Sequence, residues 1–177
     1  MKHRSIVGMV IALGLSSFLR AAPIHSAAET GDVSKLRAIV AANPAAINAK
    51  NDDGLTALWL AAQKGKLEAV TFLLENGADV DPKSDDGVTP LWIAAQQGYV
   101  EVVKALLAKN ADIEAKRADG VTPLYMAADN GQIEVVKVLL AKGANPNVVA
   151  GGVSARQAAE KDGNKDIVEL LLAAEKK

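Results

Sequence analysis

Few residues of this sequence could take part directly in catalysis. It contains no Cys and only two His, His3 and His25, so thiol nucleophiles, disulfides and thiolate metal sites are excluded. It also lacks the phosphate-binding pattern G-x-x-x-x-G-K-S/T, the dinucleotide-binding pattern G-x-G-x-x-G, the zinc pattern H-E-x-x-H and the nucleophile pattern G-x-S-x-G. We therefore expect no enzyme activity, no cofactor and no small-molecule substrate.

Two acidic clusters are the only candidates for a metal site. They comprise Asp52 and Asp53, and the carboxylates at positions 79, 81, 85 and 86. A calcium loop needs alternating ligands, a central Gly and a terminal bidentate Glu, and neither cluster has them in place. We interpret both clusters as solvated turns in which Asp accepts backbone N–H groups, and we expect no metal.

Composition narrows the class of partner and of fold. The chain has 20 basic and 21 acidic residues, a formal charge of −1, which gives no general attraction for nucleic acid. Half of its residues are hydrophobic but only 3% are aromatic. The interior must then consist mainly of Ala, Leu, Val and Ile, a composition that favours closely packed helices.

The scarce aromatic residues are part of a repeat. Trp59, Trp92 and Tyr125 recur at a constant interval along the chain, and Gly54, Gly87 and Gly120 recur at the same interval. The interval divides the chain into a degenerate first unit, three full units and a truncated last one, at residues 22–54, 55–87, 88–120, 121–152 and 153–177.

Each full unit predicts two helices and a turn. Thr89-Pro90 is typical of a helix start, with Thr as the cap and Pro at the first helical position. Gly98 follows as the end of that helix, and a second amphipathic helix is expected to stop near Asn110, which tolerates left-handed geometry. Asp119-Gly120 then predicts a tight turn. Neither helix can bury its apolar side alone, so neighbouring units must stack.

These units resemble the ankyrin repeat, whose signature T-P-L-H-x-A-A is matched by residues 89–95 and 122–128. The resemblance implies an all-α solenoid of about five stacked helix-turn-helix units with projecting β-turn tips, in which the first and last units are caps and the last one is polar. The chain departs from the signature at its His position. His25 keeps the histidine in the first unit, whereas the following units have Trp59, Trp92 and Tyr125 there. For this column, two interpretations stay open: the rings bridge adjacent repeats, or they contact a partner.

The resemblance also implies where a partner protein would bind. Ankyrin proteins use the turn tips and the exposed face of the first helices, which together form a concave groove. The tip positions in this chain are Lys50, Asp52, Asp53, Lys83, Asp85, Asp86, Lys116, Arg117 and Asp119. The helix-face positions are Gln63, Lys64, Gln96, Gln97, Asp129 and Asn130, and the aromatic column completes the candidate set.

The amino terminus predicts export. Lys2, His3 and Arg4 precede an uncharged apolar run from Ile6 to Leu19, the pattern of a secretory signal peptide over residues 1–21. A 14-residue helix covers about 21 Å, short of the ~30 Å core of a bilayer, so an uncleaved membrane anchor is the weaker interpretation and a buried core helix the weakest. Cleavage after Ala28 suits the small-residue rule, whereas cleavage after Ala21 spares the first helix.

Together these features predict a non-catalytic scaffold that binds an unidentified protein through the groove and tips after export, in a bacterial periplasm or outside the cell. We expect it to be monomeric. The alternatives are a scaffold tethered to the membrane by residues 1–21, a cytoplasmic scaffold, and an enzyme or small-molecule binder, for which the sequence offers no convergent ionisable groups.

Overall fold

The computed structural model describes residues 18–176, and the side chains from Pro23 onward. Pairs of helices joined by short turns alternate with longer loops along this range. The elements are α1 (Phe18–Thr30), α2 (Val33–Ala42), the 3-10 helix η1 (Pro44–Asn48), α3 (Ala57–Gln63), α4 (Leu67–Glu75), α5 (Pro90–Gln97), α6 (Val100–Ala108), α7 (Pro123–Asp129), α8 (Ile133–Ala141), β1 (Val149–Ala150), β2 (Val153–Ser154), α9 (Ala155–Lys161) and α10 (Lys165–Glu175).

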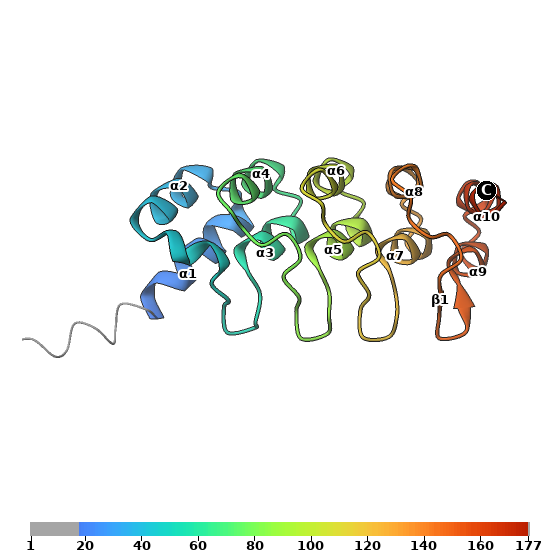
Figure 1. The fold of residues 1–177 in the computed structure, drawn as a ribbon, viewed down its shortest axis with the longest axis horizontal. Helices are drawn as coiled ribbons and strands as arrows, with labels where there is room; N and C mark the ends of the chain where they lie inside the picture. Colours follow the sequence, from blue (N-terminus) through green and yellow to red (C-terminus); the bar gives the residue numbers. More distant parts are fainter. Residues whose placement is uncertain (1–17, 177) are drawn as a thin grey trace, which may run out of the picture.

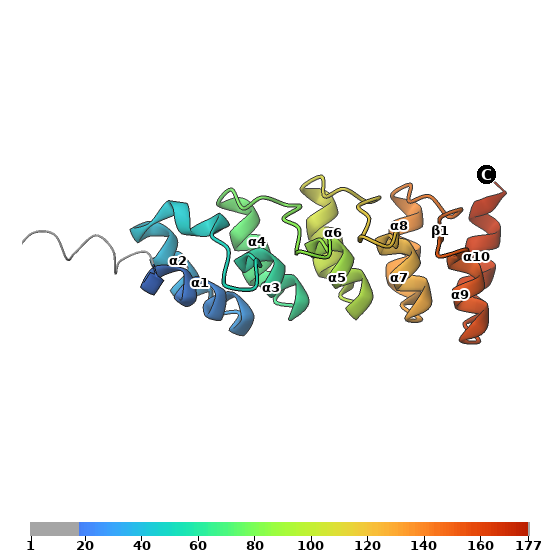
Figure 2. The same cartoon turned by 90° about the horizontal axis from the view of Figure 1, so that it is seen from below.

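The helices form two parallel layers in an elongated stack (Figure 1). The inner layer is α1, α3, α5, α7 and α9, each packed on the next, and the outer layer is α2, α4, α6, α8 and α10. Loops between successive helix pairs project from one edge as fingers, which Figure 2 shows from below. The all-α solenoid predicted from the sequence is confirmed, with one small addition: β1 and β2 pair in antiparallel fashion in the last finger.

Residues 1–17 of the predicted leader lie outside the described residues, so its signal-peptide character stays a prediction. Between residues 18 and 176, no helix combines the length and the apolar character that a bilayer crossing requires.

The inner helices begin at the predicted threonines. The hydroxyl oxygens of Thr56, Thr89 and Thr122 each accept the backbone N–H three residues on, at 3.3 Å. These threonines are at most 4% exposed, so the bond satisfies a helix N–H group that water could not reach. In the last unit Ser154 caps α9 in a reciprocal capping box with Gln157.

The helix ends also follow the predicted pattern. Gly98 ends α5 in the left-handed region, with φ of 78°, and a Cβ there would lie 2.3 Å from Oε1 of Gln132 in the next unit. The left-handed backbone therefore favours Gly here, and a side chain would also displace the amide end of Gln132. Asn110, after α6, also has a positive φ, 62°, as expected of a residue that replaces Gly at a helix end.

Alanine sets the spacing of the inner layer. Ala61, Ala94 and Ala127 are fully buried, and so is the alanine that follows each of them. Their small side chains let neighbouring inner helices approach closely, while larger residues such as Leu91 and Leu106 fill the space between the layers. The core is therefore continuous along the stack, as expected for units that cannot fold alone.

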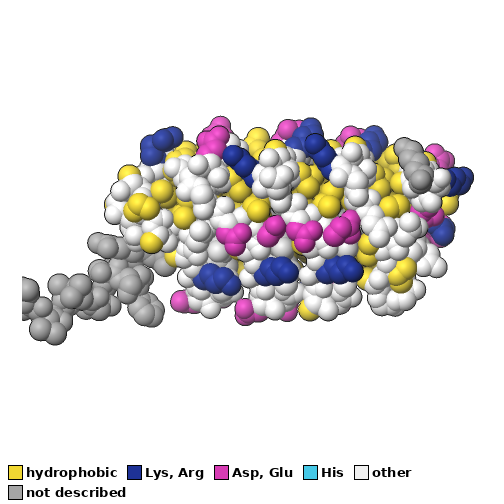
Figure 3. All heavy atoms as spheres, viewed as in Figure 1, with side chains coloured by type: hydrophobic (Ala, Val, Ile, Leu, Met, Phe, Trp, Pro, Cys, Tyr) yellow, Lys and Arg dark blue, Asp and Glu magenta, His cyan; other side chains and the backbone are white. Residues whose placement is uncertain are grey.

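A ladder of polar side chains ties the bases of the fingers together. Oδ1 of Asn48 accepts the N–H of Asp79 (2.9 Å), Oδ2 of Asp81 accepts that of Asp112 (3.0 Å), and Oε1 of Glu114 accepts that of Asn145 (2.7 Å). The three acceptors occupy the same position in successive units. Figure 3 shows acidic side chains in a line that runs from finger to finger. A calcium site would instead need several of these carboxylates to converge on one point. In the described part of the chain no group of acidic or His side chains could hold a metal ion.

One position in this ladder carries an electrostatic cost. Oδ1 of Asp81 is buried without a hydrogen-bond partner. Burial raises the pKa of Asp81, and the nearby charges of Asp112 and Asp79 raise it further, although the bond from the N–H of Asp112 opposes them. The folded protein therefore favours the neutral carboxyl, so the contribution of Asp81 to stability is greatest below its ordinary pKa and is lost as the pH rises through the raised value.

We expect Asp81→Asn to stabilise the protein at pH 7 by about 0.5 kcal/mol, a small gain because water screens a partly exposed carboxylate. Asn48 shows that an amide accepts the same bond. Urea unfolding followed by circular dichroism, at several pH values from 3 to 7, should show the gain growing with pH. The matched control is Glu114→Gln, which removes a charge from the same ladder without an orphan oxygen. An equal gain in both variants would contradict the explanation.

Candidate protein-interaction surface

The first two aromatic residues of the column are structural. Trp59 is 7% exposed and Trp92 is 2% exposed. Each indole N–H donates to a backbone carbonyl at the base of the next finger, Trp59 to Val88 and Trp92 to Val121, both at 3.0 Å. These two residues were predicted as candidate partner contacts, but they lack the accessible surface for that role. The alternative interpretation, that they bridge adjacent repeats, accounts for their geometry.

In the first unit, His25 stands where the signature carries its imidazole. It is 5% exposed, and its Nε2 lies 3.0 Å from the carbonyl oxygen of Ala49, at the base of the first finger. The imidazole therefore joins helix α1 to the chain 24 residues later. This arrangement gives it a structural role.

Arg117 was predicted as a tip residue, but it turns back onto the stack. Its guanidinium lies over the ring of Trp92, 5.0 Å from the centroid. The same group is bonded to Asp119, with Nε 3.0 Å from Oδ1 and a second contact through the other oxygen. The hydrogen bond with Arg117 lowers the pKa of Asp119 to about 2. Arg117 is thus held between an aromatic face and a carboxylate, and its charge is matched within the chain.

Tyr125, the third member of the column, differs from the two tryptophans. It is partly exposed, and in the described structure its hydroxyl makes no hydrogen bond. Burial is the main cause that raises the pKa of Tyr125, and the charges of Asp129 and Asp119 raise it further. Among residues 123–128 of α7 it is the only one that is not buried. Tyr125 therefore remains available to a partner.

The other tip residues are all accessible. Figure 3 shows basic side chains repeating from finger to finger below the acidic line. The exposed tip residues are Lys50, Asp52, Asp53, Lys83, Asp85, Asp86, Lys116 and Asp119. Nζ of Lys50 donates to the carbonyl of Lys83 (3.4 Å), and Asp119 pairs with Arg117 and accepts the N–H of Val121 (3.2 Å). The other side chains of this set make no hydrogen bond or ion pair within the described residues.

The helix-face positions fall into two classes. Lys64, Gln97 and Asn130 are exposed. Gln63, Gln96 and Asp129, one residue earlier in each unit, are half-buried. Nε2 of Gln96 lies 3.4 Å from Sδ of Met126, so this amide is partly committed to the next inner helix. Gln132, which was not predicted, donates from Nε2 to the carbonyl of Gln96 at 3.0 Å and also joins the two units.

Charged residues on the outer helices behave differently from those on the fingers. Lys104 pairs with Glu101 on α6, and Lys137 pairs with Glu134 on α8, each at 2.7 Å. These pairs lie three residues apart on one helix face, so α6 and α8 each hold one internal ion pair. Glu68 and Glu75 on α4 form no ion pair within the described residues. The charges at the finger tips are largely left for water or a partner.

The fourth finger, which contains β1 and β2, was not predicted to differ from the other three. Gly151-Gly152 between two valine-containing segments predicts a two-residue hairpin, and this signal could have been found in the sequence. Val149 is 58% exposed and Val153 is 40% exposed. The fourth finger is therefore uncharged and partly apolar where the other three carry Lys and Asp.

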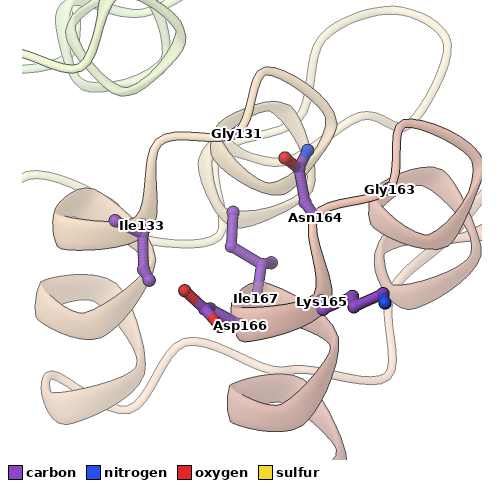
Figure 4. A pocket seen from close by; sticks show the side chains of 7 residues that line it. All are labelled: Gly131, Ile133, Gly163, Asn164, Lys165, Asp166 and Ile167. Carbon is purple, nitrogen blue, oxygen red and sulfur yellow. The ribbon is translucent and has the colours of Figure 1, made fainter.

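One pocket lies away from the groove, between the starts of α8 and α10. It has a volume of about 320 Å³ and is lined by Gly131, Ile133, Gly163, Asn164, Lys165, Asp166 and Ile167. Figure 4 shows the side chain of Lys165 directed away from that of Asp166. Because its charged groups do not converge, the pocket does not favour binding of a small molecule.

The stack of helix pairs with projecting fingers defines a repeat solenoid with its accessible polar groups on one edge. The family described as ankyrin repeats in three copies matches residues 24–117, 87–150 and 115–177. The chain belongs to the ankyrin repeat family. Ankyrin repeats are in general protein-interaction modules, and the fold is typically non-catalytic.

Among curated proteins, the chain is similar to the NAD-capped RNA hydrolase NUDT12 of Homo sapiens, Macaca fascicularis and Pongo abelii. Each is 43% identical over 53 residues, which is 30% of this chain and 12% of the relative. The chain thus matches only a small part of these relatives. So short a match carries the likeness of the repeats and not the activity in the relatives' name.

We expect Trp92→Phe to destabilise the protein by about 1–2 kcal/mol, because it removes the bond to Val121 and leaves a gap beside a buried carbonyl. Tyr125→Phe should change stability by less than about 0.5 kcal/mol, because its hydroxyl has no partner to lose. Urea unfolding measured by circular dichroism would compare the two. Equal losses would show that the indole bond is not what joins the units.

Proposed function

We propose that this protein is a non-catalytic scaffold that binds a partner protein through the finger tips and the exposed face of its inner helices, after export. The observation that carries the proposal is the set of exposed charges that repeats from finger to finger without internal partners. Lys104 and Lys137 are matched by a glutamate of their own helix, whereas finger charges such as Lys116 and Asp85 have no partner within the described residues. Polar groups left unmatched along one edge are available for an interface that is wet and polar.

The groove walls support the same proposal. The inner helices and fingers are held by buried contacts, including the Trp59 and Trp92 bonds, so the exposed residues are presented on a rigid frame. A rigid frame lowers the entropy cost of binding because little must be ordered when the partner arrives. Ankyrin-family membership favours this use of the surface.

Export rests on the leader pattern of residues 1–21. Helix α1 bears on where that leader would be cut. Ile24, Ala27 and Ala28 are at most 2% exposed, and α1 packs against α3. Cleavage after Ala28 would remove these residues and expose apolar surface of α3, whereas cleavage after Ala21 would keep the buried part of α1. We therefore propose cleavage after Ala21.

Photo-crosslinking would test the interaction surface. A photoreactive amino acid is placed singly at Lys83, Lys116 or Gln97 on the proposed surface, and at Lys104 or Lys137 on the outer helices as a matched control. In cells of the source organism, we expect the first three positions to yield one shared crosslinked protein and the two controls to yield none. Equal crosslinking from both faces, or no product from the proposed surface, would overturn the proposal.

The intact mass of the protein purified from those cells would test the leader. We expect a mass corresponding to residues 22–177. A full-length chain in the membrane fraction would support the tether, and a full-length chain in the cytoplasm would contradict export. A chain beginning at residue 29 should unfold at a clearly lower temperature than one beginning at residue 22, because it lacks the buried part of α1.

A further inference from the structure

The chain contains its own example of how this groove holds an arginine. The Arg117 guanidinium stacks on Trp92 at 5.0 Å and is bonded to Asp119, so an aromatic face and a carboxylate receive it together. Arg suits such a place because its planar group can stack and hydrogen-bond at once. The second finger carries Ser84 at the corresponding position of its unit, and within the described residues no such cation lies over Trp59.

At the next unit the aromatic ring is present but the arginine is not. The residue that corresponds to Arg117 in that unit is Ala150, in the strand pair of the fourth finger. Its short side chain cannot cover the ring of Tyr125. Tyr125 is partly exposed, whereas Trp92 is 2% exposed, and Trp59, which has no arginine over it either, is 7% exposed.

The charges around Tyr125 are negative. Asp129 lies four residues after Tyr125, one turn further along α7 and on the same side of the helix. Asp119, at the neighbouring finger tip, also acts on Tyr125, and both carboxylates raise the pKa of the phenol, after burial as the main cause. Asp119 is already matched by Arg117, but Asp129 forms no ion pair within the described residues, either with Lys161 on α9 or with any other cation.

We propose that Tyr125 and Asp129 form a seat for an arginine side chain of the partner protein, the guanidinium stacking on the ring and pairing with the carboxylate. This inference rests on the proposed function and names the chemistry of its partner. The partly exposed ring, the unpaired carboxylate one turn away and the missing internal arginine together favour a cation of this shape. The uncharged fourth finger, from Val149 to Ser154, offers no competing basic group.

The probe is an acetylated, amidated pentapeptide with one central Arg between glycines, and its control has citrulline, a neutral group of nearly the same shape. Each is titrated into the ¹⁵N-labelled protein and followed by NMR. We expect the Arg peptide to shift amide signals of residues 125–130 and 149–154. It should bind at least about fivefold more tightly than the citrulline peptide, and a Lys peptide should bind more weakly than the Arg peptide.

Variants assign the effect to the seat. Asp129→Asn and Tyr125→Leu should each weaken binding of the Arg peptide about fivefold, whereas Tyr125→Phe, which keeps the ring, should retain it. Glu101→Gln on α6 is the control for loss of a surface charge and should change nothing. Equal binding of the Arg and citrulline peptides, or an unchanged affinity in Asp129→Asn, would overturn the inference.

Failure of the seat and failure of the proposed function are distinguishable. If crosslinking identifies a partner that binds the parent, Tyr125→Leu and Asp129→Asn equally well, the scaffold function stands and the arginine seat is wrong. If the Arg peptide binds as described but finger positions crosslink to no protein, the seat stands and the scaffold function is wrong.

Discussion

The structure depends on the interface between neighbouring units, because no single helix pair can bury its own apolar side. Three kinds of contact recur between neighbouring units. Fully buried alanines pack closely, indole N–H groups donate to the next finger, and side-chain oxygens accept backbone N–H groups of the next unit. The last two are directional. They fix how far each unit is rotated against its neighbour, which packing of small apolar side chains alone would leave loose.

Features determined within one unit could be predicted from the sequence. The Thr caps, the inner-helix starts and the left-handed residue at Asn110 depend on a few consecutive residues, so local chemistry was sufficient. Contacts between units could not be predicted in this way. Trp92 turns inward and Arg117 folds back over it because a particular carbonyl and ring lie there in three dimensions. Spacing showed that the aromatic residues form a column, but not which of them the next unit would cover.

A side chain that bridges two units cannot also serve a partner. This constraint removes Trp59 and Trp92 from the binding surface, and it partly occupies Gln96 in a contact with the next inner helix. What is left for a partner is the finger tips and the exposed residues of the inner helices. The carboxylate ladder is subject to the same rule. Asp81 was first considered for metal binding because it belongs to an acidic cluster, yet one of its oxygens holds the next finger and the other is enclosed without a partner. Its place in the ladder explains its burial.

The differences between units matter for recognition as much as their likeness. Three fingers carrying Lys and Asp at the same positions would accept a partner in several registers, each shifted by one unit, with similar energies. The fourth finger lacks these charges and exposes Val149, and beside it Tyr125 is the only member of its column left partly open. A partner that contacts both the charged fingers and this end can match only one register. Because specificity is a difference in affinity between competing arrangements, the irregular end of the array gives the otherwise repetitive groove a direction.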